Sequence, residues 1–175
     1  RCFHLPQMLT IKKTPLRNPD PHRTRIIYFA DYSYKPNEDT LKQIFRHILP
    51  NLHKSMESPY VFQFFGAGLP NSMKSMIDSN KYNVEYLGFV PDVYSILLLS
   101  DIFLTPVLYD AGGVQTKTIE ALAAGVTVIS SVTGARGLSP ADCGTNLIQI
   151  SDGNWKGYVD SILTVSRETA IDRFT

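Results

Sequence analysis

The sequence lacks the features that mark several broad classes of protein. Its 17 Lys and Arg residues nearly balance 16 Asp and Glu residues, leaving a formal charge of +1, so bulk electrostatics do not favour a nucleic-acid or anionic-membrane partner. No stretch approaches the roughly 20 apolar residues that cross a bilayer. The two cysteines, Cys2 and Cys143, have no metal-ligand spacing, which favours free thiols in a cytoplasmic protein.

The chain also lacks an initiator methionine, and its last residues fall within an expected helix. We therefore expect a piece of a longer protein, whose other part carries some of any active site. A length of 175 residues suits one domain with a real core. Residues 1–24 are rich in proline and basic residues and predict a linker or extended arm, so that the domain occupies residues 25–175.

Short apolar runs alternate with helical patterns along the rest of the chain. Strands are expected at 26–29, 60–65, 84–87, 101–107, 126–130 and 146–150, and helices at 36–49, 71–78, 92–99, 116–124 and 154–173. This alternation predicts an α/β fold with a Rossmann-like parallel sheet and helices on both faces. Asn37 and Asp92 are expected helix N-caps, Pro50 is expected to end or kink the first helix, and Gly125 to close the fourth.

In such sheets ligands bind beyond the carboxyl ends of the strands, which directs attention to the segment 109–125. Gly112 and Gly113 stand just before an expected helix, where a glycine backbone and the free amides of the first turn favour an anion. Lys117 and Glu120 lie three residues apart and share a face of that helix. A lysine in the first turn opposes the helix dipole, and a bound phosphate would offset it.

A plainer interpretation remains open at this point. The two glycines can form only a tight turn, and Lys117 with Glu120 can be a solvated surface pair. The sequence contains neither a P-loop nor a G-x-G-x-x-G motif after the first expected strand, so it supports neither an ATPase nor a typical dinucleotide enzyme.

Several ordered segments together resemble a known family. They are Tyr34–Asn37 and Ile48–Pro50, then Leu87–Val93, Leu98–Asp101, Pro106, Gly112 with Gly113, Lys117, Glu120–Gly125, and Gly134–Leu138. Over about residues 25–170 the chain resembles the C-terminal, donor-binding domain of group 1 glycosyltransferases with the two-domain GT-B architecture. The resemblance implies one half of a GT-B enzyme.

The resemblance also implies a role for particular residues. Glu120 matches the second glutamate of the family's Glu–seven residues–Glu motif, which binds the donor's ribose. The other residues implied to bind the donor are Gly112, Gly113, Val114 and Gln115 at the helix start, Lys117 and Lys35 for the diphosphate, and Phe89 and Val90 beside the nucleobase. Tyr34 can reach the same pocket.

The sequence departs from the family's pattern at three positions. The motif's first glutamate, which usually contacts the transferred sugar, falls at Gly112. Ala30 replaces the glycine that often ends the first strand, and Asp31 the arginine that often follows it. An acid beside a diphosphate would repel it, so Asp31 is expected to point elsewhere or to pair with a lysine.

The resemblance implies a glycosyltransferase of the retaining, hexosyltransferase type. It would move a sugar from a nucleotide-diphosphate donor to a glycan or lipid-linked acceptor in polysaccharide biosynthesis. No metal or other cofactor is expected, because cationic groups and backbone amides can stabilise the departing diphosphate. The full-length protein is expected to be cytoplasmic, with any contact at the inner face of the membrane made by the N-terminal acceptor domain.

Two alternatives stay open. The chain can be a non-catalytic nucleotide-binding module that lost transfer with the acid at Gly112, or an epimerase-like domain of the same architecture. The isolated chain is expected to bind nucleotide weakly and to transfer nothing.

Overall fold

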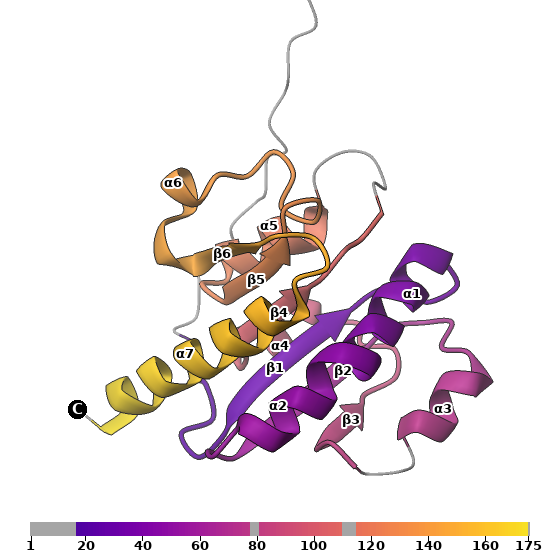
Figure 1. Cartoon of the computed structure of the whole chain (residues 1–175), viewed down its shortest axis with the longest axis horizontal. Coiled ribbons are helices and arrows are strands. Elements are labelled where there is room, and N and C mark those ends of the chain that lie inside the picture. Colours follow the sequence, from indigo (N-terminus) through magenta and orange to yellow (C-terminus); the bar gives the residue numbers. More distant parts are fainter. Residues whose placement is uncertain (1–16, 78–80, 110–114, 175) are drawn as a thin grey trace, which may run out of the picture.

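The computed structural model describes residues 17–77, 81–109 and 115–174. In these residues six strands form one parallel sheet in the order β3-β2-β1-β4-β5-β6 (Figure 1). The predicted Rossmann-like parallel sheet is therefore confirmed. The strands are β1 (Thr24–Phe29), β2 (Tyr60–Phe65), β3 (Val84–Tyr86), β4 (Ile102–Thr105), β5 (Thr127–Ser131) and β6 (Leu147–Ile150).

Helices join the strands and cover the sheet on both faces. In Figure 1, α1, α2 and α7 lie in front of the sheet, and α4 and α5 lie behind it. The helices are α1 (Lys35–Gln43), a π-helical turn η1 (Ile44–Ile48), α2 (Leu49–Ser55), α3 (Asn71–Ile77), α4 (Val93–Leu98), α5 (Thr116–Ala123), α6 (Pro140–Cys143), a short 3₁₀ turn η2 (Gly144–Asn146) and α7 (Trp155–Phe174). The short α6 was not predicted, because four residues carry no periodic pattern.

Coverage on both faces explains why the central strands are continuous apolar runs. All six residues of β2 are buried, as expected for a strand between two helical layers. The ring of Phe45 in η1 packs edge-on against Phe62 and Phe64, with centroids 6.3 and 5.8 Å away. On the other face Phe29 stacks on Phe65, with centroids 5.1 Å apart. The Phe45 contacts fix one helical layer to the sheet, and the Phe29–Phe65 stack joins β1 to β2 on the opposite face.

Pro50 does not end the first helical segment, and it lies in the first turn of α2. The helix runs on to Ser55 through the π-turn, in which the backbone N–H of Leu49 donates to the carbonyl of Ile44, five residues earlier. Proline lacks an N–H, and its ring clashes with the carbonyl four residues before it in a regular α-helix. The wider π-turn relieves that clash locally.

Among the other predicted helix boundaries, those at Asp92 and Gly125 are confirmed. Asp92 caps α4, with its Oδ1 accepting from the backbone N–H of Ser95 at 3.2 Å, and Gly125 follows the end of α5 with a φ of +74°. The predicted cap at Asn37 is wrong. The N-cap of α1 is Tyr34, with Pro36 in the first turn, and Asn37 stands inside the helix, where its side chain makes other contacts.

The described part of the expected N-terminal arm packs against the domain. The Arg17 guanidinium donates to the carbonyl oxygens of Gly125 and Ser100, at 2.6 and 2.5 Å. The backbone N–H of Asn18 donates to the carbonyl of Leu98 at 3.2 Å. Thr24, the last residue of the expected arm, is already the first residue of β1.

Strand β1 is the centre of the topology. Ile27 pairs with Gln63 of β2 on one side and with Phe103 of β4 on the other. The chain winds outward from β1 through β2 and β3, and then returns to β4, so the strand order reverses between β1 and β4. Open parallel sheets bind their ligands in the crevice beyond the carboxyl ends at such a reversal.

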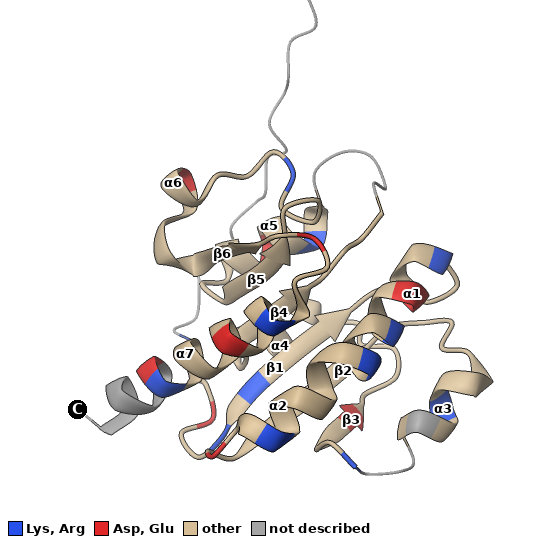
Figure 2. Ribbon diagram, viewed as in Figure 1, with Lys and Arg blue, Asp and Glu red and all other residues tan. Residues whose placement is uncertain are grey.

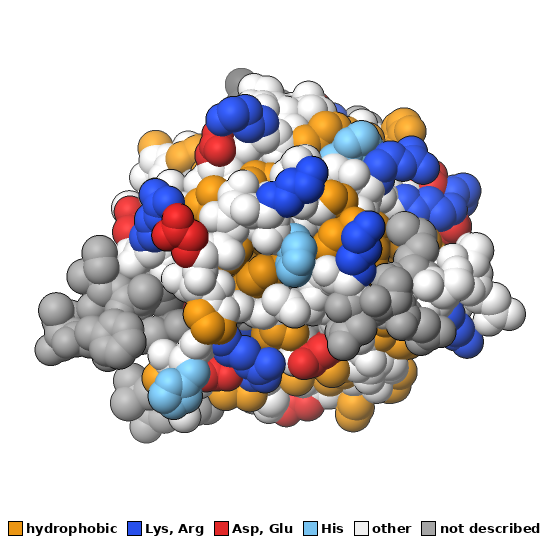
Figure 3. All heavy atoms as spheres, turned by 60° about the horizontal axis from the view of Figure 1, so that its bottom comes forward, with side chains coloured by type: hydrophobic (Ala, Val, Ile, Leu, Met, Phe, Trp, Pro, Cys, Tyr) orange, Lys and Arg blue, Asp and Glu red, His pale blue; other side chains and the backbone are white. Residues whose placement is uncertain are grey.

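Charged side chains of both signs are interspersed over the surface. Figure 2 shows basic and acidic residues side by side along α1 and α7, and on the face in Figure 3 apolar side chains lie between them. No helix in the described part of the chain is long and apolar enough to span a membrane.

Candidate functional site

A cavity of about 640 Å³ opens at the reversal point, beyond the carboxyl ends of β1, β2 and β4. Its lining comes from the loops that follow the first four strands and from the first turns of α1 and α5. The lining residues are Phe29, Ala30, Asp31, Tyr34, Pro36, Asn37, Thr40, Phe65, Gly66, Ala67, Phe89, Val90, Val93, Val107, Gln115, Thr116, Lys117 and Glu120. The cavity therefore lies where the strand order alone places a ligand.

Close backbone packing shapes the wall between β1 and β2. Gly66 follows β2 with a φ of +136°, and a Cβ on it would lie 1.8 Å from the carbonyl oxygen of Ala30. Only glycine fits this conformation and this space. The backbone N–H of Gly66 donates to the carbonyl of Gly88 at 2.8 Å, and the Tyr86 hydroxyl donates to the carbonyl of Gly66 at 2.8 Å. The loops after β1, β2 and β3 are thereby held together.

Aromatic side chains give part of the cavity an apolar character. Phe29 and Phe65, stacked at the strand ends, both line it. Phe89, in the loop between β3 and α4, is 73% exposed, and Tyr34 before α1 is 50% exposed. Exposed aromatic rings beside a cavity suit a planar ligand group that can stack on them. The predicted positions Phe89, Val90 and Tyr34 all line the cavity.

Lys117 brings a positive charge to the same space from the first turn of α5. Its Nζ lies 5.0 Å from the centroid of the Tyr28 ring and donates to Oδ1 of Asn37 at 3.3 Å. Burial lowers the pKa of the Lys117 amine to about 8. Among the described residues no carboxylate forms an ion pair with it. A partly buried ammonium at a helix start, where the helix dipole opposes it, is a site for an anion.

Glu120 lies about one turn after Lys117 on the same face of α5, and both residues line the cavity. The predicted shared face is therefore confirmed. In the part of the chain that the structure describes, no side chain donates a hydrogen bond to the Glu120 carboxylate. Its oxygens are free to accept hydrogen bonds from a ligand's hydroxyl groups.

The remaining predicted donor-site residues fall into three groups. Gln115, the N-cap of α5, lines the cavity. Gly112, Gly113 and Val114 lie outside the described residues. Lys35 does not line the cavity: its side chain is 64% exposed and forms ion pairs with Glu38, at 3.5 Å, and with Asp39.

Asp31 lines the cavity, but its carboxylate is turned to its own loop. Oδ1 of Asp31 accepts from the Ser33 hydroxyl at 2.6 Å and from the Ser33 backbone N–H at 2.9 Å. These hydrogen bonds, that from the hydroxyl first, lower the pKa of the Asp31 carboxyl. The expectation that Asp31 engages elsewhere holds, with a serine rather than a lysine as its partner.

Sequence reasoning missed both side chains that hold Lys117. Asn37 accepts from Lys117, and Tyr28 lies beneath the Lys117 ammonium. Asn37 was interpreted as a helix cap, and Tyr28 lies in the apolar run 26–29 that was expected to form the first strand. Neither contact has a signal in the sequence, because 80 residues separate Asn37 from Lys117.

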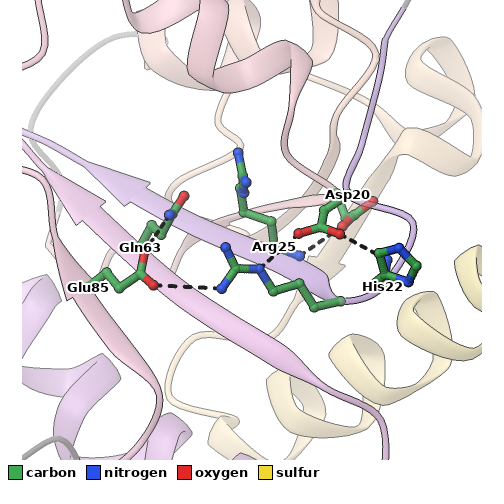
Figure 4. A network of polar contacts seen from close by, with 7 residues as sticks. Asp20, His22, Arg25, Gln63 and Glu85 are labelled. Carbon is green, nitrogen blue, oxygen red and sulfur yellow. Dashed lines mark hydrogen bonds and ion pairs between the residues drawn. The ribbon is translucent and has the colours of Figure 1, made fainter.

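A second polar cluster lies near the edge of the sheet and is separate from the cavity. Figure 4 shows Asp20, His22, Arg25, Gln63 and Glu85 together. Gln63 donates to Glu85 at 2.6 Å, and the backbone N–H of His22 donates to Asp20 at 2.9 Å. None of these five residues lines the cavity. The described residues also contain no group of three His, Cys, Asp or Glu side chains that could hold a metal ion.

Comparison with known proteins gives one family match and a set of similar folds. A family model described as "Glycosyl transferases group 1" matches residues 23–168. No curated protein sequence matches the chain. Among solved structures, a TarM variant from S. aureus, in complex with Fondaparinux, alpha-GlcNAc-glycerol and UDP, has a TM-score of 0.72 and 16% identity, over 98% of this chain and 35% of that one.

Two further structures show the same fold. WaaG, a glycosyltransferase involved in lipopolysaccharide biosynthesis, has a TM-score of 0.63 and 13% identity, over 87% of this chain and 40% of that one. The pneumococcal O-GlcNAc transferase GtfA, in complex with UDP and GlcNAc, has a TM-score of 0.63 and 15% identity, over 91% of this chain and 32% of that one. The chain thus spans less than half the length of each of these structures.

Proposed function

The chain belongs to the group 1 glycosyl transferases, and from that membership we propose that it is the donor-binding domain of such an enzyme. The ligand would be a nucleotide-diphosphate sugar, and the sugar would pass to a glycan or lipid-linked acceptor. The observation that carries this proposal is the Lys117 ammonium, partly buried beside the cavity without a carboxylate in ion-pair contact among the described residues. A nucleoside diphosphate supplies the missing negative charge.

Each part of the proposed ligand has a chemically matched part of the cavity. The diphosphate would lie at the start of α5, near Lys117 and the backbone at Gln115. Gly112, Gly113 and Val114, outside the described residues, keep the role beside the diphosphate that the sequence resemblance implies. The Glu120 carboxylate would accept hydrogen bonds from the two ribose hydroxyls, and the loop carrying Phe89 and Val90 would take the base.

In this proposal the domain acts on the leaving group. When the bond between sugar and diphosphate breaks, negative charge grows on the diphosphate. A preorganised ammonium and oriented amides stabilise that charge. We propose that the acceptor site and any catalytic base belong to the N-terminal half of the full-length protein. The isolated chain would accordingly bind nucleotide weakly and transfer nothing.

The proposal is tested by calorimetric titration with UDP and GDP. UDP comes first, because two of the similar structures contain it. Wild type should bind one of the two nucleotides. Lys117→Met should weaken binding by about tenfold or more, as for loss of a charge-assisted hydrogen bond. The matched control is Lys54→Met, which removes an exposed lysine of α2 far from the cavity lining. Equal nucleotide affinity in wild type and Lys117→Met would contradict the proposal that Lys117 binds the diphosphate.

The full-length protein separates transfer from binding alone. Hydrolysis or transfer of the donor sugar by that protein supports the enzyme. Binding of the nucleotide without turnover of any donor sugar would instead support the non-catalytic module, in which Gly112 in place of the family's acid has abolished transfer.

A further inference from the structure

Asn37 makes two side-chain hydrogen bonds that join the two sides of the cavity. Its Nδ2 donates to the backbone carbonyl of Asp31 at 2.9 Å, in the loop after β1. Its Oδ1 accepts from Nζ of Lys117 at 3.3 Å, on α5. Asn37 itself lies in the first turns of α1 and lines the cavity. One amide thus connects α1, the loop after β1 and α5 across the reversal of strand order.

These two partners fix the orientation of the amide. A carbonyl oxygen only accepts hydrogen bonds, and an ammonium only donates them. Turning the Asn37 amide over would set its NH₂ against the Lys117 ammonium and its oxygen against the Asp31 carbonyl. Both hydrogen bonds would then be replaced by repulsive contacts. The orientation seen is therefore the one that the chemistry of the two partners requires.

Tyr28 contacts both Asn37 and Lys117 from β1. Its hydroxyl donates to the backbone carbonyl of Asn37 at 3.2 Å, and its ring lies under the Lys117 ammonium. The same buried tyrosine therefore contacts both members of the pair. A lysine has a long, flexible side chain that loses rotamer entropy when it is fixed. Fixing Lys117 before the ligand arrives removes that cost from the binding step.

The neutral character of Asn37 matters as much as its position. An aspartate there would form an ion pair with Lys117 and neutralise it, whereas an amide holds the ammonium and leaves its charge unbalanced. Among the described residues, the other ionisable groups that line the cavity with Lys117 are Glu120 on its own helix, Tyr34 before α1 and Asp31 in the loop after β1, and Tyr28 of β1 lies beneath the ammonium. The Asp31 carboxylate already accepts two hydrogen bonds from Ser33, and Glu120 is not within ion-pair distance of Lys117 in the described structure.

We propose that Asn37 is a positioning residue for the donor's diphosphate: it holds the Lys117 ammonium toward the cavity without neutralising it. This inference rests on the proposed function and deepens it. It assigns to the Pro-Asn dipeptide at the start of α1 a role in recognising the ligand's negative charge. Asn37 acts through Lys117 and does not itself contact the anion.

The first test needs no ligand, and it uses the whole 175-residue chain. NMR of isotope-labelled lysine follows the pKa of the Lys117 amine, with its signal assigned by its loss in Lys117→Met. Asn37→Ala removes an acceptor that stabilises the charged amine, so it should lower this pKa below that of wild type. Asn37→Asp supplies a carboxylate in the same place, so it should raise it. Opposite shifts from two substitutions at one site distinguish positioning from general loss of packing.

The second test measures affinity for UDP at pH 7. Asn37→Ala should weaken UDP binding by about fivefold to tenfold, as for loss of a partly buried hydrogen bond. Asn37→Asp should weaken it by at least as much, because its carboxylate competes with the diphosphate for Lys117. Asn51→Ala is the matched control. It also removes an asparagine that donates to a backbone carbonyl, that of His47, but it lies on α2 away from the cavity and should bind as wild type.

The outcomes separate this inference from the proposed function. A Lys117 pKa that does not move in opposite directions in the two variants overturns the inference, whether or not UDP binds. Expected pKa shifts with unchanged UDP affinity in the variants overturn it as well. If wild type binds neither UDP nor GDP, the proposed function fails. Thermal unfolding of each variant, compared with Asn51→Ala, shows that the changes arise in folded protein.

Discussion

A Cβ on Gly66 would lie 1.8 Å from the carbonyl oxygen of Ala30. The two backbones meet where β1 and β2 end, and this contact sets the wall of the cavity. The φ of Gly66, at +136°, is one that residues with a side chain rarely adopt. Neither the contact nor the conformation tolerates a methyl group.

Gly66→Ala should therefore lower the free energy of unfolding by about 3 kcal/mol, since it combines backbone strain with a clash against rigid backbone. The matched control is Gly153→Ala. Gly153 also has a positive φ, of +77°, but a Cβ on it meets nothing within 4 Å. That variant should lose only about 1 kcal/mol. Urea denaturation measures both, and equal losses would show that the contact with Ala30 is not what demands glycine.

Removing Lys117 should make the protein more stable while it impairs binding. Burial holds the pKa of this amine near 8, below its ordinary value of 10.5, so the folded state resists the charge that the unfolded state accepts freely. Lys117→Met should raise the free energy of unfolding at pH 7 by about 1–3 kcal/mol. Lys54→Met, at an exposed position, should change it by less than about 0.5 kcal/mol. A destabilised Lys117→Met would contradict this account of the amine.

The same shift predicts how the stability of wild type depends on pH. Between about pH 8 and 10.5 the unfolded state binds more protons at this lysine than the folded state does. The contribution of Lys117 therefore rises with pH across that window and is flat on either side of it. The difference in unfolding free energy between wild type and Lys117→Met should shrink as the pH rises from 8 to 10. A constant difference would mean that the pKa of the amine is not lowered.

Phe89 should contribute to binding but not to stability. Its ring is 73% exposed and lines the cavity, so Phe89→Ala should change the free energy of unfolding by less than about 0.5 kcal/mol. Loss of stacking on a base should weaken nucleotide binding by about tenfold, which corresponds to roughly 1.4 kcal/mol. Val132→Ala, at an apolar residue that is 55% exposed outside the cavity lining, serves as the control for titration and denaturation. If Phe89→Ala and the control bind the nucleotide with equal affinity, the Phe89 ring does not contact it.

The sequence predicted the fold well because its signals are local. Apolar runs such as Tyr60–Phe65 fix the strands, Asp92 and Gly125 fix helix ends, and regular alternation fixes the parallel sheet. Pro50 shows the limit of local rules. Its effect on a helix can be relieved by a π-turn, and the packing of Phe45 against the sheet favours keeping the helix in place.

Of the site, the sequence predicted the position of Lys117 and Glu120 but not the side chains that hold Lys117. Lys117 and Glu120 share a face by helical spacing alone, and strand order places that face at the cavity. The partners that hold Lys117 come from β1 and α1, and only the fold brings them there. For Lys35 the family resemblance implies a contact with the diphosphate. In the structure two acids of the next turn, Glu38 and Asp39, pair with Lys35 on the helix surface.

The most direct measurement of the central claim is a double-mutant cycle on the ribose contact. Wild type and Glu120→Ala are titrated with UDP and with 2′-deoxy-UDP, and Glu57→Ala, an exposed acid outside the cavity lining, is the control. Wild type and the control should prefer UDP by about tenfold or more, as for a hydrogen bond to a charged group. Glu120→Ala should lose that preference. If Glu120→Ala discriminates between the two nucleotides as well as wild type does, the cavity does not bind ribose through Glu120.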